Sequence, residues 1–493
     1  MTPYLGMYVH MHWGYHHPYA ARTWTIGDWR SYATGLSRLG YNLVMIWPLT
    51  ESMPDPPTTS DLAHLEKLHA VIDMLHAEFG MTALITFGAN TVGNEHAAAY
   101  TFEERPFFKT DLRLNPGDPA AVDRLLRIRR SLYRHLANAD GMVVIDSDPG
   151  GYVGSTNREF AALLQRHMDM LDELNPSAML YYWLWVGWES YNRFWEQAEK
   201  TGTAEIRSEM SDWETVLDDL LAHPDDRWRL LVCWPQHRDL AARRGVDDRV
   251  IYFPYGLVEG EPTFPLTNCD PSGLAKGIGG YPWGRPYLGC MANAQTHTAQ
   301  LPHTYLFAHF ARGGTQETAD LRSFAADLVP GMDELLVDAW TTLQRGLPAR
   351  ARDIAAAMAA ERERLTAAGK LLTGPLSGLL MGEPGRFLCD LEMQLAFYAD
   401  MKDFVDAREQ GLDGKPEARA LVASWRAWMF RTGFVDAYGG PVERILHPTL
   451  RALRDPAIER VLAKFDDWHN PAVRNGVVPR LISALAGYAE SGR

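Results

Sequence analysis

The feature of this sequence that most restricts its fold is a regular alternation of strand-like and helical segments across residues 1–313. Short apolar runs, rich in β-branched and aromatic residues, recur between turn formers and segments with helical spacing of apolar residues. Such alternation produces parallel strands joined by right-handed crossovers, and eight units predict a closed (β/α)8 barrel. The eight runs are Gly6–Met11, Tyr41–Trp47, Met81–Phe87, Met142–Ile145, Ala178–Trp185, Trp228–Trp234, Arg249–Tyr255 and Tyr287–Ala292.

Helix signals fill most of the segments between these runs. The clearest is Ser60–Phe79, where apolar residues recur three and four positions apart as on an amphipathic face, and Gly80 follows as a stop. Another helix is expected to open near Thr25 and close at Gly40. The remaining predicted helices are Pro119–Ala137, Asn157–Leu174, Trp213–Ala222 and Asp239–Arg244. The stretch 90–118 is predicted to be long and irregular.

The character of the chain changes from about Gly314 onward, where helix signals dominate and strand signals almost vanish. Predicted helices in this part are Leu335–Gln344, Ala351–Ala367, Phe387–Arg408, Ala418–Arg431 and Pro456–Phe465. The sequence therefore predicts two domains: a (β/α)8 barrel catalytic domain over 1–313 and an all-helical C-terminal domain over 314–493.

Charge and hydropathy narrow the classes of partner. A formal net charge of −14 argues against nucleic acid, because phosphate binding needs a basic surface. No apolar run approaches the roughly 20 residues that span a bilayer. The start of the chain lacks the charged segment and apolar run of a signal peptide. We therefore expect a cytoplasmic protein without a membrane partner, and the oligomeric state stays open, a homo-oligomer included.

The stretch Asp140–Gly151, reading DGMVVIDSDPGG, is the strongest candidate for chemistry. Its apolar run is followed at once by Asp146 and Asp148, and then by a Pro-Gly-Gly turn. Because strand side chains alternate between faces, the two aspartates share one face if the strand continues through them. Crowded carboxylates repel each other, which raises one pKa and places an acid beside a base. The plainer interpretation is that one aspartate caps the next helix or serves the turn.

In a barrel of this kind, the active site lies at the carboxyl ends of the strands. The 16 tryptophans are mostly expected in the core, but several stand at these ends beside polar residues. Aromatic rings can stack on the apolar faces of a sugar while polar groups bond its hydroxyls, so a carbohydrate substrate is predicted. The predicted substrate-binding residues are His10, His12, Trp13, Trp47, Asn90, Trp183, Trp185, Trp188, Trp234, Tyr255, Asn293 and His297. The same strand ends also carry Glu51, Glu189, His237, Glu259 and Gln295.

The pattern D-G-x-x-x-x-D-x-D, the aromatic fifth strand and the helical C-terminal part resemble a group of glycoside hydrolases. These are the β-N-acetylhexosaminidases of family 20 and their relatives in families 84 and 18. The resemblance implies a glycoside hydrolase in which Asp146 orients the substrate 2-acetamido group, whose carbonyl attacks the anomeric carbon. It implies that Asp148 protonates the leaving oxygen. Ser147 separates the two aspartates here, whereas family 20 has adjacent Asp-Glu and family 84 adjacent Asp-Asp, so an acetamido requirement stays open.

A mechanism with two protein carboxylates is the variant that needs no acetamido group. Many barrel glycosidases place the acid after strand four and the nucleophile after strand seven, which pairs Asp148 with Glu259. Glu189, after the Trp-rich fifth strand, is a further candidate. Carboxyl groups about 5–5.5 Å apart indicate retention of configuration, and about 6.5–9.5 Å inversion. No cofactor or metal is required by either scheme.

Two other classes of function remain open. His10-Met11-His12 on the first strand is similar to the H-x-H of amidohydrolase barrels, where both imidazoles bind a divalent ion. Those barrels also need histidines after strands five and six and an aspartate after strand eight, where this chain has Trp and Glu, the offset His237 and Asn293. The second alternative is a carbohydrate-binding barrel without catalysis, against which the doubled aspartate argues.

Overall fold

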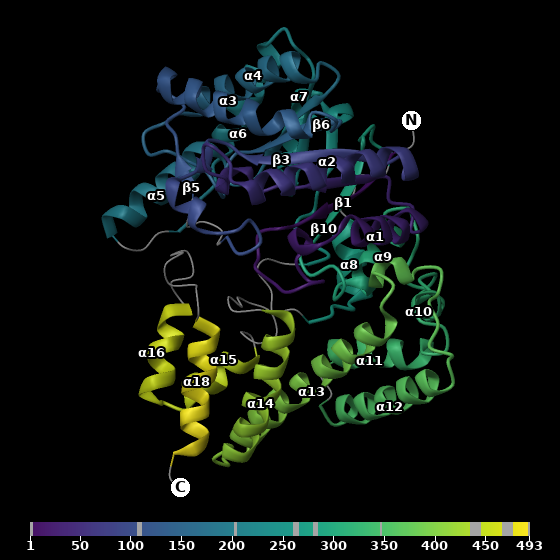
Figure 1. Cartoon of the computed structure of the whole chain (residues 1–493). Helices are drawn as coiled ribbons and strands as arrows, with labels where there is room; N and C mark the ends of the chain where they lie inside the picture. Colours follow the sequence, from purple (N-terminus) through teal and green to yellow (C-terminus); the bar gives the residue numbers. More distant parts are fainter. Residues whose placement is uncertain are drawn as a thin grey trace. The chain divides into compact units, whose positions relative to one another are not determined.

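The computed structural model describes residues 3–105, 111–201, 205–259, 266–279, 284–345, 348–433, 445–465 and 477–491. Contacts divide the chain into two compact units that interleave along the sequence. The first comprises Met1–Gly14, Gly40–Tyr255 and Gly277–Asn293, and the second Tyr15–Leu39, Gly256–Lys276 and Ala294–Arg493. Figure 1 follows the chain from purple to yellow through both. The predicted domain boundary after residue 313 stays a prediction.

Eight parallel strands close into a barrel, as the alternation in the sequence predicted. Around the barrel they follow the order β1, β2, β3, β6, β7, β8, β9 and β10. Their bounds are β1 Tyr4–Val9, β2 Leu43–Ile46, β3 Thr82–Gly88, β6 Gly141–Ile145, β7 Met179–Leu184, β8 Trp228–Val232, β9 Val250–Tyr252 and β10 Gly289–Ala294. The chain is therefore a (β/α)8 barrel with a helical C-terminal region.

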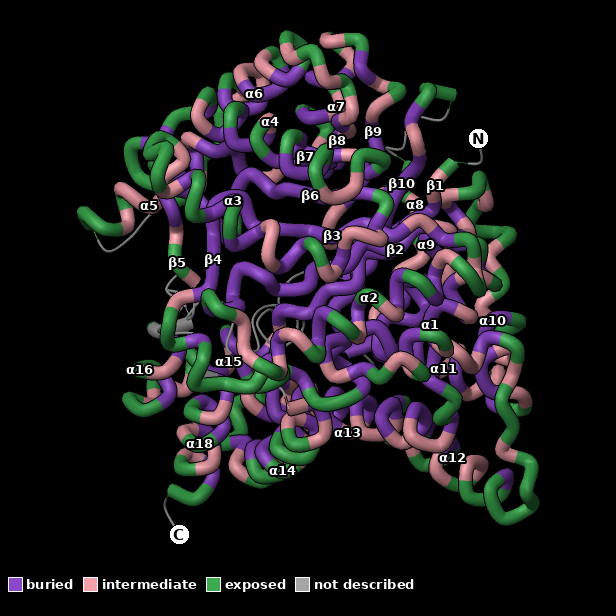
Figure 2. Tube along the Cα trace, turned by 45° about the horizontal axis from the view of Figure 1, so that its top comes forward, coloured by how far each residue is buried: buried purple, intermediate pink, exposed green. Residues whose placement is uncertain are grey.

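The barrel strands are buried along almost their whole length, and Figure 2 shows them as mainly purple stretches of the trace. Aromatic side chains fill the interior. The ring of Tyr8 on β1 lies 5.7 Å from that of Trp183 on β7 and 6.0 Å from Phe253, which follows β9. Strands from different sides of the barrel thus meet through these rings, which is the packed interior typical of the fold.

Two helices of the first unit, α2 and α4, begin at capping boxes that the sequence supplies. Thr58 and Asp61 form a capping box before α2, and Gly80 ends α2 in the left-handed conformation with φ of 62°. Thr156 and Glu159 form the same box before α4. The bounds are α2 Thr59–Phe79, α3 Pro119–Tyr133, α4 Asn157–Leu174, α5 Trp188–Thr201, α6 Met210–Ala222 and α7 Pro235–Arg244.

Two elements of the first unit were not predicted. The stretch expected to be irregular contains a short antiparallel ribbon, β4 Thr91–Gly93 with β5 Asp111–Arg113. Helix α5 follows the fifth barrel strand directly, at a position for which the sequence suggested no helix. Both elements adjoin the candidate site described below.

The second unit is helical. Its helices are α1 Ile26–Arg38, α8 Pro271–Ile278, α9 Leu301–Phe310, α10 Leu321–Leu328, α11 Asp333–Arg345, α12 Pro348–Ala367, α13 Pro384–Glu409, α14 Lys415–Thr432, α15 His447–Ala452, α16 Pro456–Phe465 and α18 Val477–Glu490. All five helices predicted for the C-terminal part are confirmed. In the part of the chain that the structure describes, none of the helices is both long and apolar enough to cross a membrane.

Candidate active site at the carboxyl ends of the barrel strands

The Asp146–Asp148 pair lies beyond the strand that was expected to carry it. Strand β6 ends at Ile145, so strict alternation does not continue into the pair. Asp146 is fully buried with 0% exposure, whereas Asp148 is exposed. Asp148 has a left-handed backbone with φ of 50°, which costs energy for a residue other than glycine and is typical of functional sites. Gly150 and Gly151 follow with positive φ angles and complete the predicted turn.

Asp146 is an anchor for the turn that follows β7. Its carboxylate accepts hydrogen bonds from the backbone N–H groups of Trp185 at 3.0 Å and Val186 at 3.1 Å. It also accepts from the side chains of Ser147, Tyr182 and Trp213. Burial raises the pKa of Asp146, and hydrogen bonds from Ser147, the turn and Trp213 oppose that rise.

The partners of Asp146 also show which way it faces. Tyr182 packs its ring 5.6 Å from Phe160 of α4, and Trp213 belongs to α6, so both stand on the outer face of the barrel. Asp146 therefore points toward the helix layer, and Asp148 alone of the pair is presented to solvent. The predicted orienting role of Asp146 stays a prediction.

The loop that carries Asp148 is held on both sides. The hydroxyl of Tyr191 on α5 donates to Asp148 Oδ1 at 3.4 Å. Asn192 Oδ1 accepts from the backbone N–H of Tyr152 at 2.7 Å. On the other side, Asn90 Nδ2 donates to the carbonyl of Gly151 at 3.1 Å. The predicted binding residue Asn90 is fully buried, and the hydrogen bond from its amide nitrogen fixes the loop.

A surface hollow of about 480 Å³ adjoins this loop. Its lining residues come from β5, the loop after Asp148 and the end of α5, namely Asp111, Leu112, Arg113, Tyr152, Val153 and Glu199. The Arg113 guanidinium lies 4.5 Å over the ring of Trp195, and Trp195 packs against Tyr191, which bonds Asp148. The ribbon and α5, both missed from the sequence, thus shape the surroundings of Asp148.

Predicted aromatic binding residues form two layers at the strand ends. Trp47 and Trp183 are buried and belong to the packed interior. The outer layer consists of four half-buried rings, Trp13, Trp185, Trp234 and Tyr255. Ring centroids of Trp185 and Tyr255 lie 4.8 Å apart, and those of Trp185 and Trp234 5.3 Å apart. Of the predicted aromatic binding residues, these four offer ring surface at the mouth of the barrel.

The two histidines of the first strand end lie against each other. Their Nδ1 atoms are 3.2 Å apart, and the backbone N–H of His12 donates to His10 Nδ1, also at 3.2 Å. His10 stacks on Trp13 with an interplanar angle of 10°, and His12 meets Trp47 edge-on. Both predicted binding residues are therefore placed at the aromatic mouth, and both are buried.

Glu51 joins this cluster, although it was not among the predicted catalytic or binding residues. It lies in the 3-10 turn Thr50–Ser52 after β2 and is 2% exposed. Its Oε1 atom is 3.9 Å from His12 Nε2. Burial raises the pKa of Glu51 to about 8, against the opposing effects of its own backbone amide, the Trp47 indole and Arg129. The only signal in the sequence was its position at a strand end.

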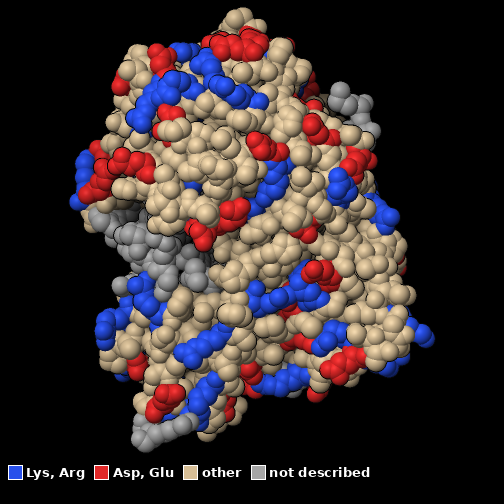
Figure 3. Space-filling view, in the orientation of Figure 1, with Lys and Arg blue, Asp and Glu red and all other residues tan. Residues whose placement is uncertain are grey.

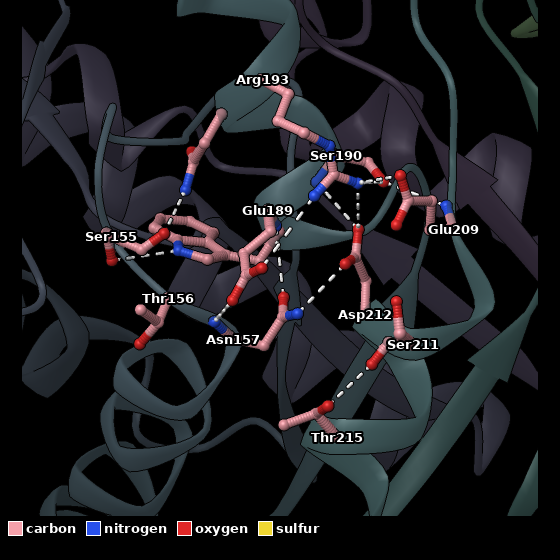
Figure 4. Close-up of polar contacts among 12 residues, drawn as sticks. Ser155, Thr156, Asn157, Glu189, Ser190, Arg193, Glu209, Ser211, Asp212 and Thr215 are labelled. Atoms are coloured by element: carbon pink, nitrogen blue, oxygen red, sulfur yellow. Dashed lines mark hydrogen bonds and ion pairs between the residues drawn. The ribbon is translucent and has the colours of Figure 1, made fainter.

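The predicted alternative carboxylate Glu189 works as a helix cap. Its Oε1 accepts from the backbone N–H of Asn157, the first residue of α4, at 2.8 Å. Asn157 in turn accepts from the Glu189 N–H and donates to Asp212 Oδ1. Figure 4 shows Asn157 between the two acids, with Arg193 near both. Trp188, at the start of α5, is fully buried and stacks on Phe160 at 5.0 Å, away from the mouth.

Three further predicted residues lie near the eighth strand end. Asn293 is buried on β10 in the first unit. Glu259 and His297 belong to the second unit. The Glu259 carboxylate is buried and accepts hydrogen bonds from the Gln295 N–H, the Thr296 N–H and hydroxyl, and Gln300. His297 Nδ1 lies 3.0 Å from the Tyr32 hydroxyl. Both residues therefore have structural partners within their unit.

Many charged side chains on the surface form ion pairs. Arginines of α3 and α4 pair with acids, as in Arg127–Asp55 at 2.9 Å and Arg130–Glu173 at 2.7 Å. Figure 3 shows basic and acidic side chains together on the face in view. Among the described residues, no group of three His, Cys, Asp or Glu side chains is arranged to hold a metal ion.

No protein-family model and no curated protein matches this chain. Solved structures of glycoside hydrolases are similar to it in fold. An O-GlcNAc hydrolase of Thermobaculum terrenum is 8% identical with a TM-score of 0.46, covering 94% of this chain and 97% of that chain. A family 20 β-N-acetylhexosaminidase of Streptomyces coelicolor is 10% identical with a TM-score of 0.35, covering 66% and 67%.

A GH5_18 protein of Streptomyces cattleya, solved with Manβ1-4GlcNAc, is 17% identical with a TM-score of 0.27. That match covers 37% of this chain and 45% of the other, so the chain spans less than half the length of that protein. These likenesses are distant, and the chemistry of this chain has to be inferred from its own residues.

Proposed function

We propose that this protein is a glycoside hydrolase that cleaves an exo-terminal glycosidic bond at the carboxyl end of its barrel. The observation that carries this proposal is Asp148, an exposed carboxylate in a strained left-handed conformation directly after β6. Such strain is kept where the surrounding structure enforces a functional geometry. In the proposed reaction Asp148 protonates the leaving oxygen, and water supplies the hydroxyl group that ends on the anomeric carbon.

The aromatic mouth favours a sugar as the substrate. Half-buried Trp185, Trp234 and Tyr255 offer ring faces and edges next to one another. Sugar rings have apolar C–H faces that pack on such surfaces, and their hydroxyls need the few polar groups that a binding site adds to an apolar lining. In this scheme Asp146 holds the turn after β7, so that the mouth keeps its shape.

A panel of aryl α- and β-glycosides, with and without a 2-acetamido group, tests the proposal. We expect release of the phenol from at least one member in EDTA, and a loss of about a thousandfold in kcat for Asp148→Asn on aryl groups that need protonation. Cleavage confined to acetamido sugars supports substrate assistance, and cleavage of sugars without that group supports a second protein carboxylate.

The adjacent imidazoles of His10 and His12 are the observation that favours one alternative function, a metal-dependent hydrolase. Its signature in the same panel is activity that EDTA abolishes and Zn²⁺ restores. Binding of a sugar with no turnover by the wild type, and equal affinity in Asp148→Asn, would instead identify a carbohydrate-binding barrel.

A further inference from the structure

Glu51 is a buried acid whose carboxyl oxygens lack a partner. Both Oε1 and Oε2 are shielded from solvent, and neither accepts a hydrogen bond among the described residues. The Trp47 indole N–H and the backbone amide of Glu51 lie close enough to lower the pKa of the carboxyl, but neither reaches it with the geometry of a hydrogen bond. Buried polar groups are nearly always satisfied, and an exception calls for water, an ion or a ligand. The missing partner of Glu51 is therefore a group that the described residues do not supply.

The position of Glu51 places it on the rim that carries Asp148. Barrel strands β2, β3 and β6 are consecutive, so the two acids follow strands on either side of β3. The neighbourhood is continuous, because Gly93 of the ribbon lies against Ser52 and Met53, while Gly88 at the end of β3 lies against Pro149. Glu51 thus lies at the carboxyl ends of the strands, where barrel enzymes bind their substrates.

The His12 imidazole lies beside Glu51. His10 Nδ1 accepts the backbone N–H of His12 at 3.2 Å, and His12 Nδ1 lies 3.2 Å from the same nitrogen. The other ring nitrogen of His12, Nε2, is 3.9 Å from Glu51 Oε1, a separation too long for a direct hydrogen bond.

Burial favours the neutral form of Glu51. Of the nearby charges, Arg129 attracts the ionised carboxylate and Asp111 repels it. Burial outweighs Arg129, and a pKa of about 8 leaves the carboxyl mostly protonated at pH 7. A protonated carboxyl presents its O–H as a donor beside its carbonyl oxygen as an acceptor. A hydroxyl group has the complementary pair, because its oxygen accepts and its hydrogen donates.

We propose that Glu51 binds a hydroxyl group of the terminal sugar and is a specificity-determining residue of this enzyme. The proposal rests on the proposed glycoside hydrolase function. It assigns Glu51 to substrate binding and leaves the reacting carboxylate at Asp148.

The test compares Glu51→Gln and Glu51→Leu on the aryl glycoside that the wild type cleaves best. Gln keeps one donor and one acceptor at the same place, so its KM is expected within about threefold of the wild-type KM. Leu removes both, and its KM is expected to rise at least tenfold with kcat within about threefold. Glu173→Gln, an exposed acid of α4 paired with Arg130, is the control and should leave both constants unchanged.

Thermal unfolding at pH 8 separates binding from a structural role. Removing an unpartnered buried acid should leave the unfolding midpoint of both variants equal to or above that of the wild type. A KM for Glu51→Leu within threefold of wild type would overturn the proposal, as would equal damage by Gln and Leu, or a lowered midpoint in both. If the wild type cleaved no member of the panel, that result would instead count against the proposed function itself.

Discussion

His237 and Glu51 are buried titratable side chains, and burial favours the neutral form of each. Their effects on how the free energy of unfolding changes with pH are opposite. His237 on α7 has no hydrogen-bond partner at either ring nitrogen among the described residues and meets the ring of Trp213 at 4.3 Å. Burial lowers the pKa of His237 to about 3. For Glu51 burial raises the pKa to about 8. His237 thus destabilises the fold as pH falls below its ordinary pKa, and Glu51 destabilises it as pH rises from about 4.5 to about 8.

Replacement of His237 by leucine should flatten the acid side of the stability curve. The unfolded state takes up a proton near the ordinary histidine pKa of about 6.5 while the folded state does not. Stability from this residue is therefore full above that pH and is lost progressively as pH falls toward about 3. Between pH 7 and pH 5 the wild type should lose about 2 kcal/mol more unfolding free energy than His237→Leu. Urea unfolding at both pH values measures this difference, and equal losses would contradict it.

Single residues also show where the sequence was informative about the site. In the structure Asp148, His10, His12 and the aromatic mouth follow barrel strands, at the positions from which the sequence predicted a site, and their roles stay predictions. Alternation could not place Asp146, because β6 ends one residue earlier and the chain then turns. Glu51 could not be distinguished from an ordinary loop glutamate, because its burial depends on β4 and the neighbouring strands rather than on its own segment.

At the scale of elements, the junction of β6, β7 and α6 is held by one carboxylate. Backbone groups of the turn after β7 and the Trp213 indole of α6 all donate to Asp146. Strands and amphipathic helices of the barrel were predictable because their patterns are local. The ribbon β4–β5 was not predictable, because each of its strands has only three residues. Helix α5 was missed because the aromatic residues at its start were assigned to the strand end.

Asp146→Ala should destabilise the protein by about 3 kcal/mol, because it leaves several buried donors without an acceptor. Asp148→Ala is the matched control, because that carboxylate is exposed and does not anchor the turn after β7; its effect should lie within about 1 kcal/mol. Urea unfolding at pH 7 compares the two. Similar stability of both variants would show that Asp146 is not an anchor.

For the whole molecule, the sequence predicted a barrel followed by helices, and that architecture is observed. The sequence did not reveal that the contacts group residues 15–39 and 256–276 with the C-terminal helices, because long-range contacts leave no periodic signal. The first unit carries Asp148, Glu51 and the aromatic mouth. The proposed function requires that Asp148 supply a proton to a leaving glycosidic oxygen.

The most direct test varies the leaving group in the wild type and in Asp148→Asn. A good leaving group such as dinitrophenol departs without a proton, whereas a poor one such as an unsubstituted phenol needs the acid. We predict that kcat/KM of Asp148→Asn falls at least a thousandfold on the phenyl glycoside but less than about tenfold on the dinitrophenyl glycoside. An equal fall on both, or no fall on either, would contradict the role of Asp148 as the proton donor.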